Sequence, residues 1–130
     1  MTTTGDLPEF LSRETDFALL APKTEVSLET AVEMVSTAIE YCRTYEIDGL
    51  MVDARQLYGF PQPSVVDRYW FLRKWASESA GQVVLSMIQR PEMIDPEQIG
   101  ITIAANAGLQ INVFDNESDA RTWLVETISG

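Results

Sequence analysis

The sequence predicts one α/β domain: a four- to five-stranded, mostly parallel sheet with an N-terminal hairpin and about four helices. Three observations support this fold class. Helical apolar patterns alternate with short apolar runs after residue 27, and helices of that length normally connect parallel neighbouring strands through right-handed crossovers. The 130 residues suffice for one core. No repeat, low-complexity stretch or linker divides the chain, so we expect a flexible tail over residues 1–8 and one domain over 9–130.

The N-terminal half is expected to contain a hairpin, a long helix and a buried strand. Glu9–Arg13 and Asp16–Ala21 resemble two short strands separated by polar residues. Ser27 is a good N-cap for a helix over Leu28–Tyr45. This helix has an apolar stripe typical of core packing, formed by Leu28, Val32, Val35, Ile39 and Cys42. The apolar run Gly49–Asp53 then predicts a strand buried on both faces.

The middle of the chain predicts a loop, a second helix and the clearest strand. The loop spans Ala54–Pro63 and contains two prolines. Ser64 caps the following helix, expected over Val65–Ala80, and Gly81 supplies its left-handed stop. The run Gln82–Gln89 is expected to be the next strand.

The C-terminal part predicts a third helix, a last strand and a fourth helix. Asp95 followed by Pro96 indicates a helix start, with an Asp N-cap and proline at the first helical position. We expect this helix to run to about Ala107 and to stop at Gly108. The strand Gln110–Phe114 follows. The final helix, capped by Asn116 or Asp115, is expected to bury Ala120, Trp123, Leu124 and Ile128.

The charge balance argues against some classes of partner. The chain has 20 acidic and 9 basic side chains, for a formal net charge of −11. Proteins that bind nucleic acids need lysine and arginine against the phosphates, so we expect no nucleic-acid partner. Stable association with anionic membranes is disfavoured for the same reason. The excess of acid is also explained simply by solubility.

The chain has one cysteine and no histidine. A single thiol cannot form an internal disulfide, so a cytoplasmic location fits best. Without histidine the usual neutral-pH base and the commonest transition-metal ligand are missing, so we expect no metal site, no cofactor and no histidine-assisted nucleophile. Cys42 lies in a helical apolar stripe, where an inert buried thiol is expected. Residues Met1–Asp6 lack the basic and apolar regions of a signal peptide.

Polar residues follow the predicted parallel strands. Ligands bind open α/β sheets outside the carboxyl ends of the strands. Asp53 and Arg55 follow one strand, Arg90 and Asp95 follow the next, and Asp115 follows the last. Arg68, early in its helix, adds a third arginine. The three arginines could bind a phosphate or a carboxylate. The candidate ligand-binding residues at this edge are Asp53, Arg55, Arg68, Arg90 and Asp95.

A structural explanation of the same residues stays open. Asp53 is within reach of Arg55 or Arg68, while capping explains Asp95 and Asp115. No catalytic residue is assigned, because nothing orients a nucleophile or builds an oxyanion hole. The glycines form no phosphate-binding loop either.

Aromatic residues are unusually frequent around the second predicted helix. Tyr69, Trp70, Phe71 and Trp75 cannot all share one face of it, so at least one is expected at an interface or beneath the preceding loop. The candidate interface residues are Tyr58, Phe60, Trp70, Phe71 and Trp75.

Several short motifs, taken in order, resemble one known family. They are Val52-Asp53-Ala54-Arg55 with Gly59, Asp67-Arg68-Tyr69, Arg90-Pro91-Glu92-Met93-Ile94-Asp95-Pro96, Ala105-Asn106-Ala107-Gly108, and Val113-Phe114 with Ala120 and Trp123-Leu124. In this order and spacing the chain resembles the bacterial SpoIIAA-like family, also described as STAS/SEC14-like domains, over about residues 16–125.

The resemblance implies a sheet of four or five strands with helices packed against it, and it implies no enzyme activity or cofactor. Anti-sigma-factor antagonists carry a phosphorylatable serine in an Asp-Ser-x-Gly motif at a helix start, which this chain lacks. Ser64 occupies a helix start but is already explained as an N-cap. The SEC14-like part of the name hints at lipid binding, and fold analogy alone supports neither function.

Three functions remain open at this stage. The leading one is a non-enzymatic regulatory or interaction module that binds another protein or a second copy of itself. The alternative is a small-ligand binder, for a lipid or an anionic metabolite, which would need a cavity of about 300 Å³ or more at the arginine edge. An enzyme would need Asp53 and Asp95 in one cleft with displaced pKa values.

Overall fold

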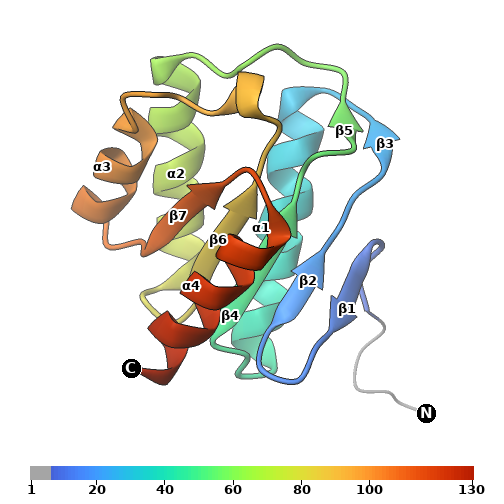
Figure 1. The fold of residues 1–130 in the computed structure, drawn as a ribbon, viewed down its shortest axis with the longest axis vertical. Helices are drawn as coiled ribbons and strands as arrows, with labels where there is room; N and C mark the ends of the chain where they lie inside the picture. The colour runs from blue at the N-terminus through green and yellow to red at the C-terminus, as the bar shows by residue number, and fades with distance from the viewer. Residues whose placement is uncertain (1–6) are drawn as a thin grey trace.

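A five-stranded mixed sheet, seen in a computed structural model that describes residues 7–130, organises the chain (Figure 1). Its strands are ordered β1-β2-β4-β6-β7, with β1 antiparallel to β2 and the other pairs parallel. The elements in chain order are β1 Leu11–Arg13, β2 Ala18–Leu20, β3 Thr24–Glu25, α1 Leu28–Thr44, β4 Gly49–Asp53, β5 Leu57–Tyr58, α2 Val65–Ser79, β6 Val84–Ile88, a 3₁₀ turn Pro91–Met93, α3 Ile99–Asn106, β7 Ile111–Phe114 and α4 Glu117–Ser129.

The α/β class, the N-terminal hairpin and the mostly parallel sheet are confirmed, and residues 7–130 form four α-helices. The hairpin strands are shorter than expected. The first begins at Leu11 because Pro8 to Leu11 form a turn, in which the Leu11 N–H donates to the Pro8 carbonyl. Most of the expected tail, residues 1–6, lies outside the described residues. Within the described part of the chain, no helix has the length and apolar character needed to span a bilayer.

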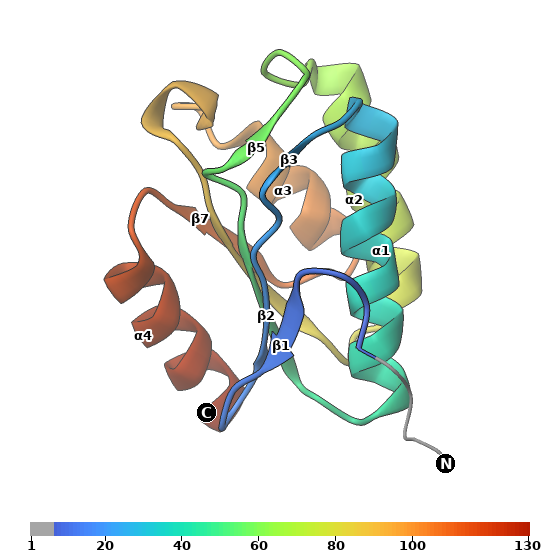
Figure 2. The same ribbon diagram turned by 90° about the vertical axis from the view of Figure 1, so that its right-hand side faces the viewer.

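The sheet is covered on both faces (Figure 2): α1, α2 and α3 lie on one side and α4 on the other. This arrangement explains the continuous apolar run of β4. Leu50 and Val52 pack into the larger core beneath α1–α3, while Met51 packs against α4. Alternate side chains of a strand point to opposite faces of the sheet. A strand buried on both faces is therefore apolar at successive positions.

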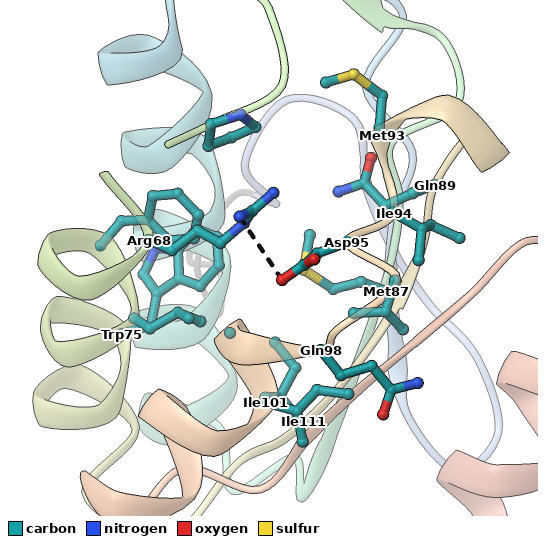
Figure 3. A pocket seen from close by; sticks show the side chains of 15 residues that line it. Arg68, Trp75, Met87, Gln89, Met93, Ile94, Asp95, Gln98, Ile101 and Ile111 are labelled. Atoms are coloured by element: carbon teal, nitrogen blue, oxygen red, sulfur yellow. Dashed lines mark ion pairs between the residues drawn. The ribbon is translucent and has the colours of Figure 1, made fainter. Parts of the chain in front are cut away.

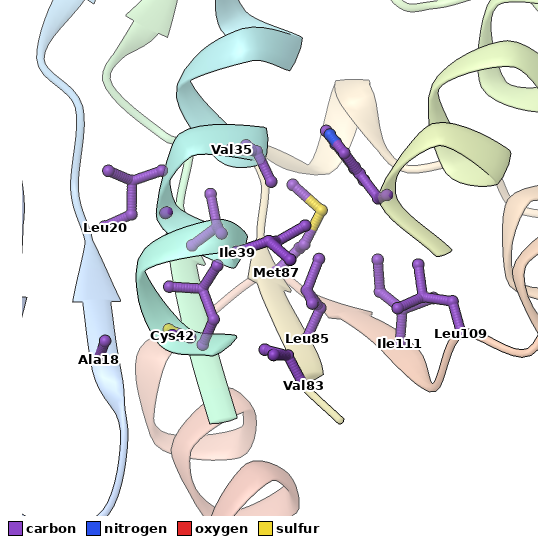
Figure 4. Close-up of a cluster of buried hydrophobic side chains, with 14 of the residues drawn as sticks. Ala18, Leu20, Val35, Ile39, Cys42, Val83, Leu85, Met87, Leu109 and Ile111 are labelled. Carbon is purple, nitrogen blue, oxygen red and sulfur yellow. The ribbon is translucent and has the colours of Figure 1, made fainter. Parts of the chain in front are cut away.

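The larger core lies between α1, α2 and the sheet (Figure 4). Val35, Ile39 and Cys42 of α1 meet Leu85 and Met87 of β6 there, as the helical stripe predicts. Cys42 is fully buried, and burial raises the pKa of its thiol to about 12. The thiol is therefore protonated at neutral pH and is a packing group.

The predicted caps form where local sequence decides them. The Ser27 hydroxyl accepts from the Thr30 N–H at the start of α1. Ser64 and Asp67 form a capping box on α2, each side chain accepting the other's backbone N–H. Of the two candidates for α4, Asn116 is the N-cap.

The predicted start of the third helix at Asp95 is wrong. Gln98 adopts a left-handed conformation (φ 56°, ψ 35°), so residues 95–98 form a turn and α3 begins only at Ile99. The Asp95 carboxylate accepts the N–H groups of Glu97 and Ile99, both at 3.0 Å. Asp95 therefore stabilises the turn of residues 95–98, and it also accepts the N–H of Ile99, the first residue of α3.

A second, two-stranded sheet was not predicted. Thr24–Glu25 (β3) pairs in parallel with Leu57–Tyr58 (β5), which lies inside the expected loop. The Val26 N–H donates to the Tyr58 carbonyl at 2.8 Å. Gly59 follows with a φ of 114°, and a Cβ there would overlap the Val26 carbonyl oxygen. This small sheet attaches the segment after β4 to the segment before α1.

Candidate functional site

The carboxyl ends of β4, β6 and β7 lie at one edge of the sheet, as the parallel register requires. The five candidate residues do not form one cluster there. The structure pairs Asp53 with Arg55, and Arg68 with Asp95, whereas Arg90 binds backbone carbonyls. Asp115 is exposed and accepts a hydrogen bond from the Asn116 side chain.

Asp53 ends β4 and is fully engaged by Arg55. One carboxylate oxygen accepts the Arg55 backbone N–H at 3.2 Å and its Nε–H at 2.9 Å, and the other accepts from Nη2 at 2.8 Å. This bidentate contact lowers the pKa of Asp53 below its ordinary value, although partial burial opposes the shift. The carboxylate is thus held charged and is directed at its own arginine.

Arg90 follows β6 and holds the β5 segment in place. Its Nη1 donates to the backbone carbonyls of Arg55 and Leu57, both at 3.1 Å, and its Nε donates to Glu92 at 3.1 Å. The guanidinium also stacks over the Tyr58 ring, 4.3 Å from its centroid. Together with the Asp53–Arg55 pair, these contacts favour the structural explanation for this side of the edge.

Arg68 and Asp95 form the other group. Arg68 extends from the first turns of α2, and Asp95 lies in the turn before α3. Arg68 Nη1 lies 3.8 Å from Asp95 Oδ2, which is beyond a direct hydrogen bond. Two backbone N–H groups already bind the Asp95 carboxylate, and they are the main cause of its lowered pKa.

An apolar cleft opens beside this pair (Figure 3). Its walls come from α2, β6, the 3₁₀ turn, α3 and β7, and its cavity volume is about 100 Å³. A second hollow of about 80 Å³ extends towards α1. The two hollows share the side chains of Pro63, Phe71, Trp75, Met87, Gln89 and Met93. We call these two hollows together the α2 cleft.

The size of the α2 cleft limits what it can hold. Binding sites for drug-sized molecules and lipids usually exceed about 300 Å³. Neither hollow reaches that volume, so the cavity expected of a small-ligand binder is not found at this edge. There is no room for a lipid, and only a molecule of about one aromatic ring would fit. Asp95 lines the cleft and Asp53 does not, so the two carboxylates share no cleft in which they could act as an acid–base pair.

The candidate interface aromatics separate into buried and exposed residues. Trp75 is 3% exposed, and its indole N–H donates to the Val32 carbonyl of α1, so it cannot contact a partner directly. Phe71 is half-buried against Trp75, and half-buried Phe60 packs on the cluster around Leu57. Only Tyr58 and Trp70 expose much of their surface.

The exposed apolar residues of α2 are a different set from the predicted interface candidates, and they share only Trp70 with it. Val66 is 77% exposed, Tyr69 55%, Val65 49% and Trp70 43%. Residues spaced by three and four lie side by side on a helix, so the four form one continuous surface, which we call the α2 patch. Arg73, one turn further along, stacks over the Tyr69 ring at 5.3 Å. Val65 and Val66 are not among the interface candidates that the sequence suggests, because helical periodicity alone does not show which apolar face of a helix is exposed.

The described residues offer little for metal binding. Nowhere in residues 7–130 do three histidine, cysteine or acidic side chains gather as a metal ion would require. Ser64 is exposed at the start of α2, and its hydroxyl is used in the capping box.

Comparison of the chain with protein-family models, with curated proteins and with solved structures finds no match in any of the three. The geometry of the α2 patch and the α2 cleft is therefore the basis for proposing a function.

Proposed function

We propose that this chain is a non-enzymatic protein-interaction module and that the α2 patch is its docking surface. The observation that carries the proposal is the exposure of Val65, Val66, Tyr69 and Trp70 on one face of α2. Contiguous exposed apolar surface is uncommon on monomers, and tyrosine and tryptophan are enriched at the centres of interfaces.

We further propose that the partner is a different protein. A net charge of −11 opposes the approach of a second copy of the chain. The same charge attracts a basic protein over long range and so favours its association rate. Apolar side chains of that partner would cover the α2 patch, and burial of apolar area would supply most of the affinity.

The arrangement of the carboxylates supports a non-enzymatic role. Asp53 is paired with Arg55 in a bidentate contact, and Asp95 accepts backbone N–H groups of its own turn. Both carboxylates have lowered pKa values and so remain charged near neutral pH. A general acid would need the opposite shift.

We also propose a relationship to the SpoIIAA-like, STAS-type domains. The mixed five-stranded sheet, its N-terminal hairpin and the four helices of residues 7–130 are compatible with that fold. Binding of a regulatory partner would be consistent with that relationship.

The test compares affinity capture by three forms of the full chain: wild type, Val66→Glu and Thr122→Glu. Val66 is 77% exposed in the α2 patch, and Thr122 is exposed on α4, across the sheet. Both substitutions add the same charge at an exposed helical position, so each should leave the free energy of unfolding within about 0.5 kcal/mol of wild type. Circular dichroism checks that condition.

We expect a specific protein to be retained by wild type and by Thr122→Glu, with its recovery on Val66→Glu reduced roughly tenfold or more. Equal recovery on all three forms would overturn the assignment of the α2 patch. Light scattering on the purified chain tests the choice of partner: a dimer that Val66→Glu dissociates would show that the second copy, rather than another protein, occupies the patch.

A further inference from the structure

The Arg68 side chain is largely buried, yet its guanidinium has no hydrogen-bond acceptor among the described residues. It is 13% exposed, and its nearest carboxylate oxygen lies 3.8 Å away. It makes no side-chain hydrogen bond with any described residue, in contrast to Arg55 and Arg90, whose guanidinium donors have acceptors at 2.8 to 3.1 Å. A guanidinium has five N–H donors, and those of Arg68 still reach solvent, so a ligand can accept hydrogen bonds from them by displacing water.

Backbone N–H groups stabilise the Asp95 carboxylate more than Arg68 does. Both of its carboxylate oxygens accept backbone N–H groups at 3.0 Å, from Glu97 and Ile99. Releasing Arg68 from Asp95 would therefore leave that carboxylate hydrogen-bonded in its turn. Arg68 can therefore bind another acceptor without leaving the Asp95 carboxylate unpaired.

The space in front of Arg68 is apolar, with one further polar group. Figure 3 shows the guanidinium directed into the cleft and the carboxamide of Gln89, the residue after β6, directed towards it. The rest of the wall is mainly apolar and includes Phe71, Met87, Ile101 and Ile111. A charged donor and an amide above a small apolar cavity fit an acceptor group that carries an apolar tail.

We propose that the α2 cleft binds a small monocarboxylate, whose carboxylate accepts from Arg68 and whose compact ring or short chain fills the apolar hollow. The cavity volume of about 100 Å³ limits the tail to roughly the size of one aromatic ring. The neighbouring Asp95 carboxylate and the net charge of −11 disfavour a doubly charged phosphate. This site is separate from the α2 patch, so its failure would not affect the proposed docking surface.

The test uses benzoate as the probe, with benzamide as its neutral counterpart and inorganic phosphate as the divalent anion. Each is titrated into the isotopically labelled full chain, and amide chemical shifts are followed by NMR. We expect saturable shifts with benzoate that cluster on residues lining the cleft. Benzamide should bind roughly tenfold or more weakly, because it lacks the charge-assisted contact, and phosphate should cause no saturable shift there.

Three variants assign the contact. Arg68→Met keeps the apolar stem and should lower benzoate affinity to that of benzamide. Arg73→Met, the same change on the outer face of α2, should leave it unchanged. Ile101→Phe fills the cavity and should abolish binding of both aromatic probes.

The proposal is overturned if the wild-type chain shows no saturable shift with benzoate. It is equally overturned if the shifts map outside the cleft, or if Arg68→Met binds benzoate as tightly as Arg73→Met does. Should Arg68→Met fail to fold, the comparison of benzoate, benzamide and phosphate on the wild-type chain decides the question alone.

Discussion

Asp53 shows how a charge at the end of a parallel strand can serve the fold. Its carboxylate receives three hydrogen bonds from Arg55, which lies two residues further along the chain. This contact fixes the path of the chain as it leaves β4 and enters β5. Arg90 then holds the same segment through the Arg55 and Leu57 carbonyls.

The Asp53–Arg55 contact predicts a pH-dependent stability. The folded pKa of Asp53 lies below its unfolded value of about 3.9, so the contact stabilises the fold above that pH. The stabilisation is lost as the pH falls through the folded pKa. Asp53→Asn should therefore lower the free energy of unfolding by about 0.5–1 kcal/mol at pH 7.

Urea unfolding of wild type and Asp53→Asn at a series of pH values measures this difference, which should shrink as the pH is lowered below about 4. Asp48→Asn, at an exposed carboxylate, is the control and should stay within about 0.5 kcal/mol of wild type at pH 7. A difference that is constant from pH 7 down to acid would contradict the role given to the carboxylate.

Individual site residues were only partly predictable from the sequence. The strand ends correctly located Asp53, Arg55 and Arg90 near one edge, because parallel strands bring their carboxyl ends together. Arg90 donates to the backbone carbonyls of Arg55 and Leu57, whereas Arg68 has no such acceptor. No local sequence pattern shows which arginine these carbonyls will contact. Arg68 is distinguished from Arg90 only in three dimensions.

Helix α2 connects both proposed surfaces. Its inner face carries Phe71 and Trp75 into the cleft and the core, and its outer face carries Tyr69 and Trp70. The expectation that these four aromatics could not share one face is confirmed. Two of the five candidate interface residues, Phe71 and Trp75, belong to the inner side instead.

The two tryptophans of α2 give a matched test of this division. Trp75→Phe removes the hydrogen bond to the Val32 carbonyl and leaves a void between α1 and α2. We expect it to lower the free energy of unfolding by about 1–3 kcal/mol. Trp70→Phe, at a residue 43% exposed, should change it by no more than about 0.5 kcal/mol.

Denaturant unfolding followed by far-ultraviolet circular dichroism compares the two variants directly. Equal losses of stability, or a larger loss for Trp70→Phe, would contradict the orientation of α2.

Elements set by local chemistry were predicted well, and those set by distant contacts were not. Ser27 and Ser64 cap α1 and α2 as expected, because capping needs only neighbouring residues. The start of α3 was misplaced because Gln98 takes a left-handed conformation that glycine or asparagine more often signals. β3 and β5 were missed because each has only two residues and its pairing partner is more than thirty residues away.

At the scale of the whole molecule, the five-stranded sheet separates the proposed functional surfaces from α4. The α2 patch and the α2 cleft lie on the three-helix side, and α4 covers the other face alone (Figure 2). The chain carries a net charge of −11, whereas the α2 patch is apolar and is contacted by the Arg73 guanidinium at Tyr69. This contrast between an acidic molecule and an apolar helix face underlies the proposal that a different, basic protein docks on α2.

Site-specific photo-crosslinking in the native cell tests that claim most directly. A benzophenone amino acid replaces Val66 in the α2 patch in one form of the chain and Thr122 on α4 in another. We expect light to produce one defined adduct with a different protein from position 66 and none from position 122. No adduct at position 66, the same adduct from both positions, or an adduct with the mass of two copies of the chain would contradict the claim that another protein docks on α2.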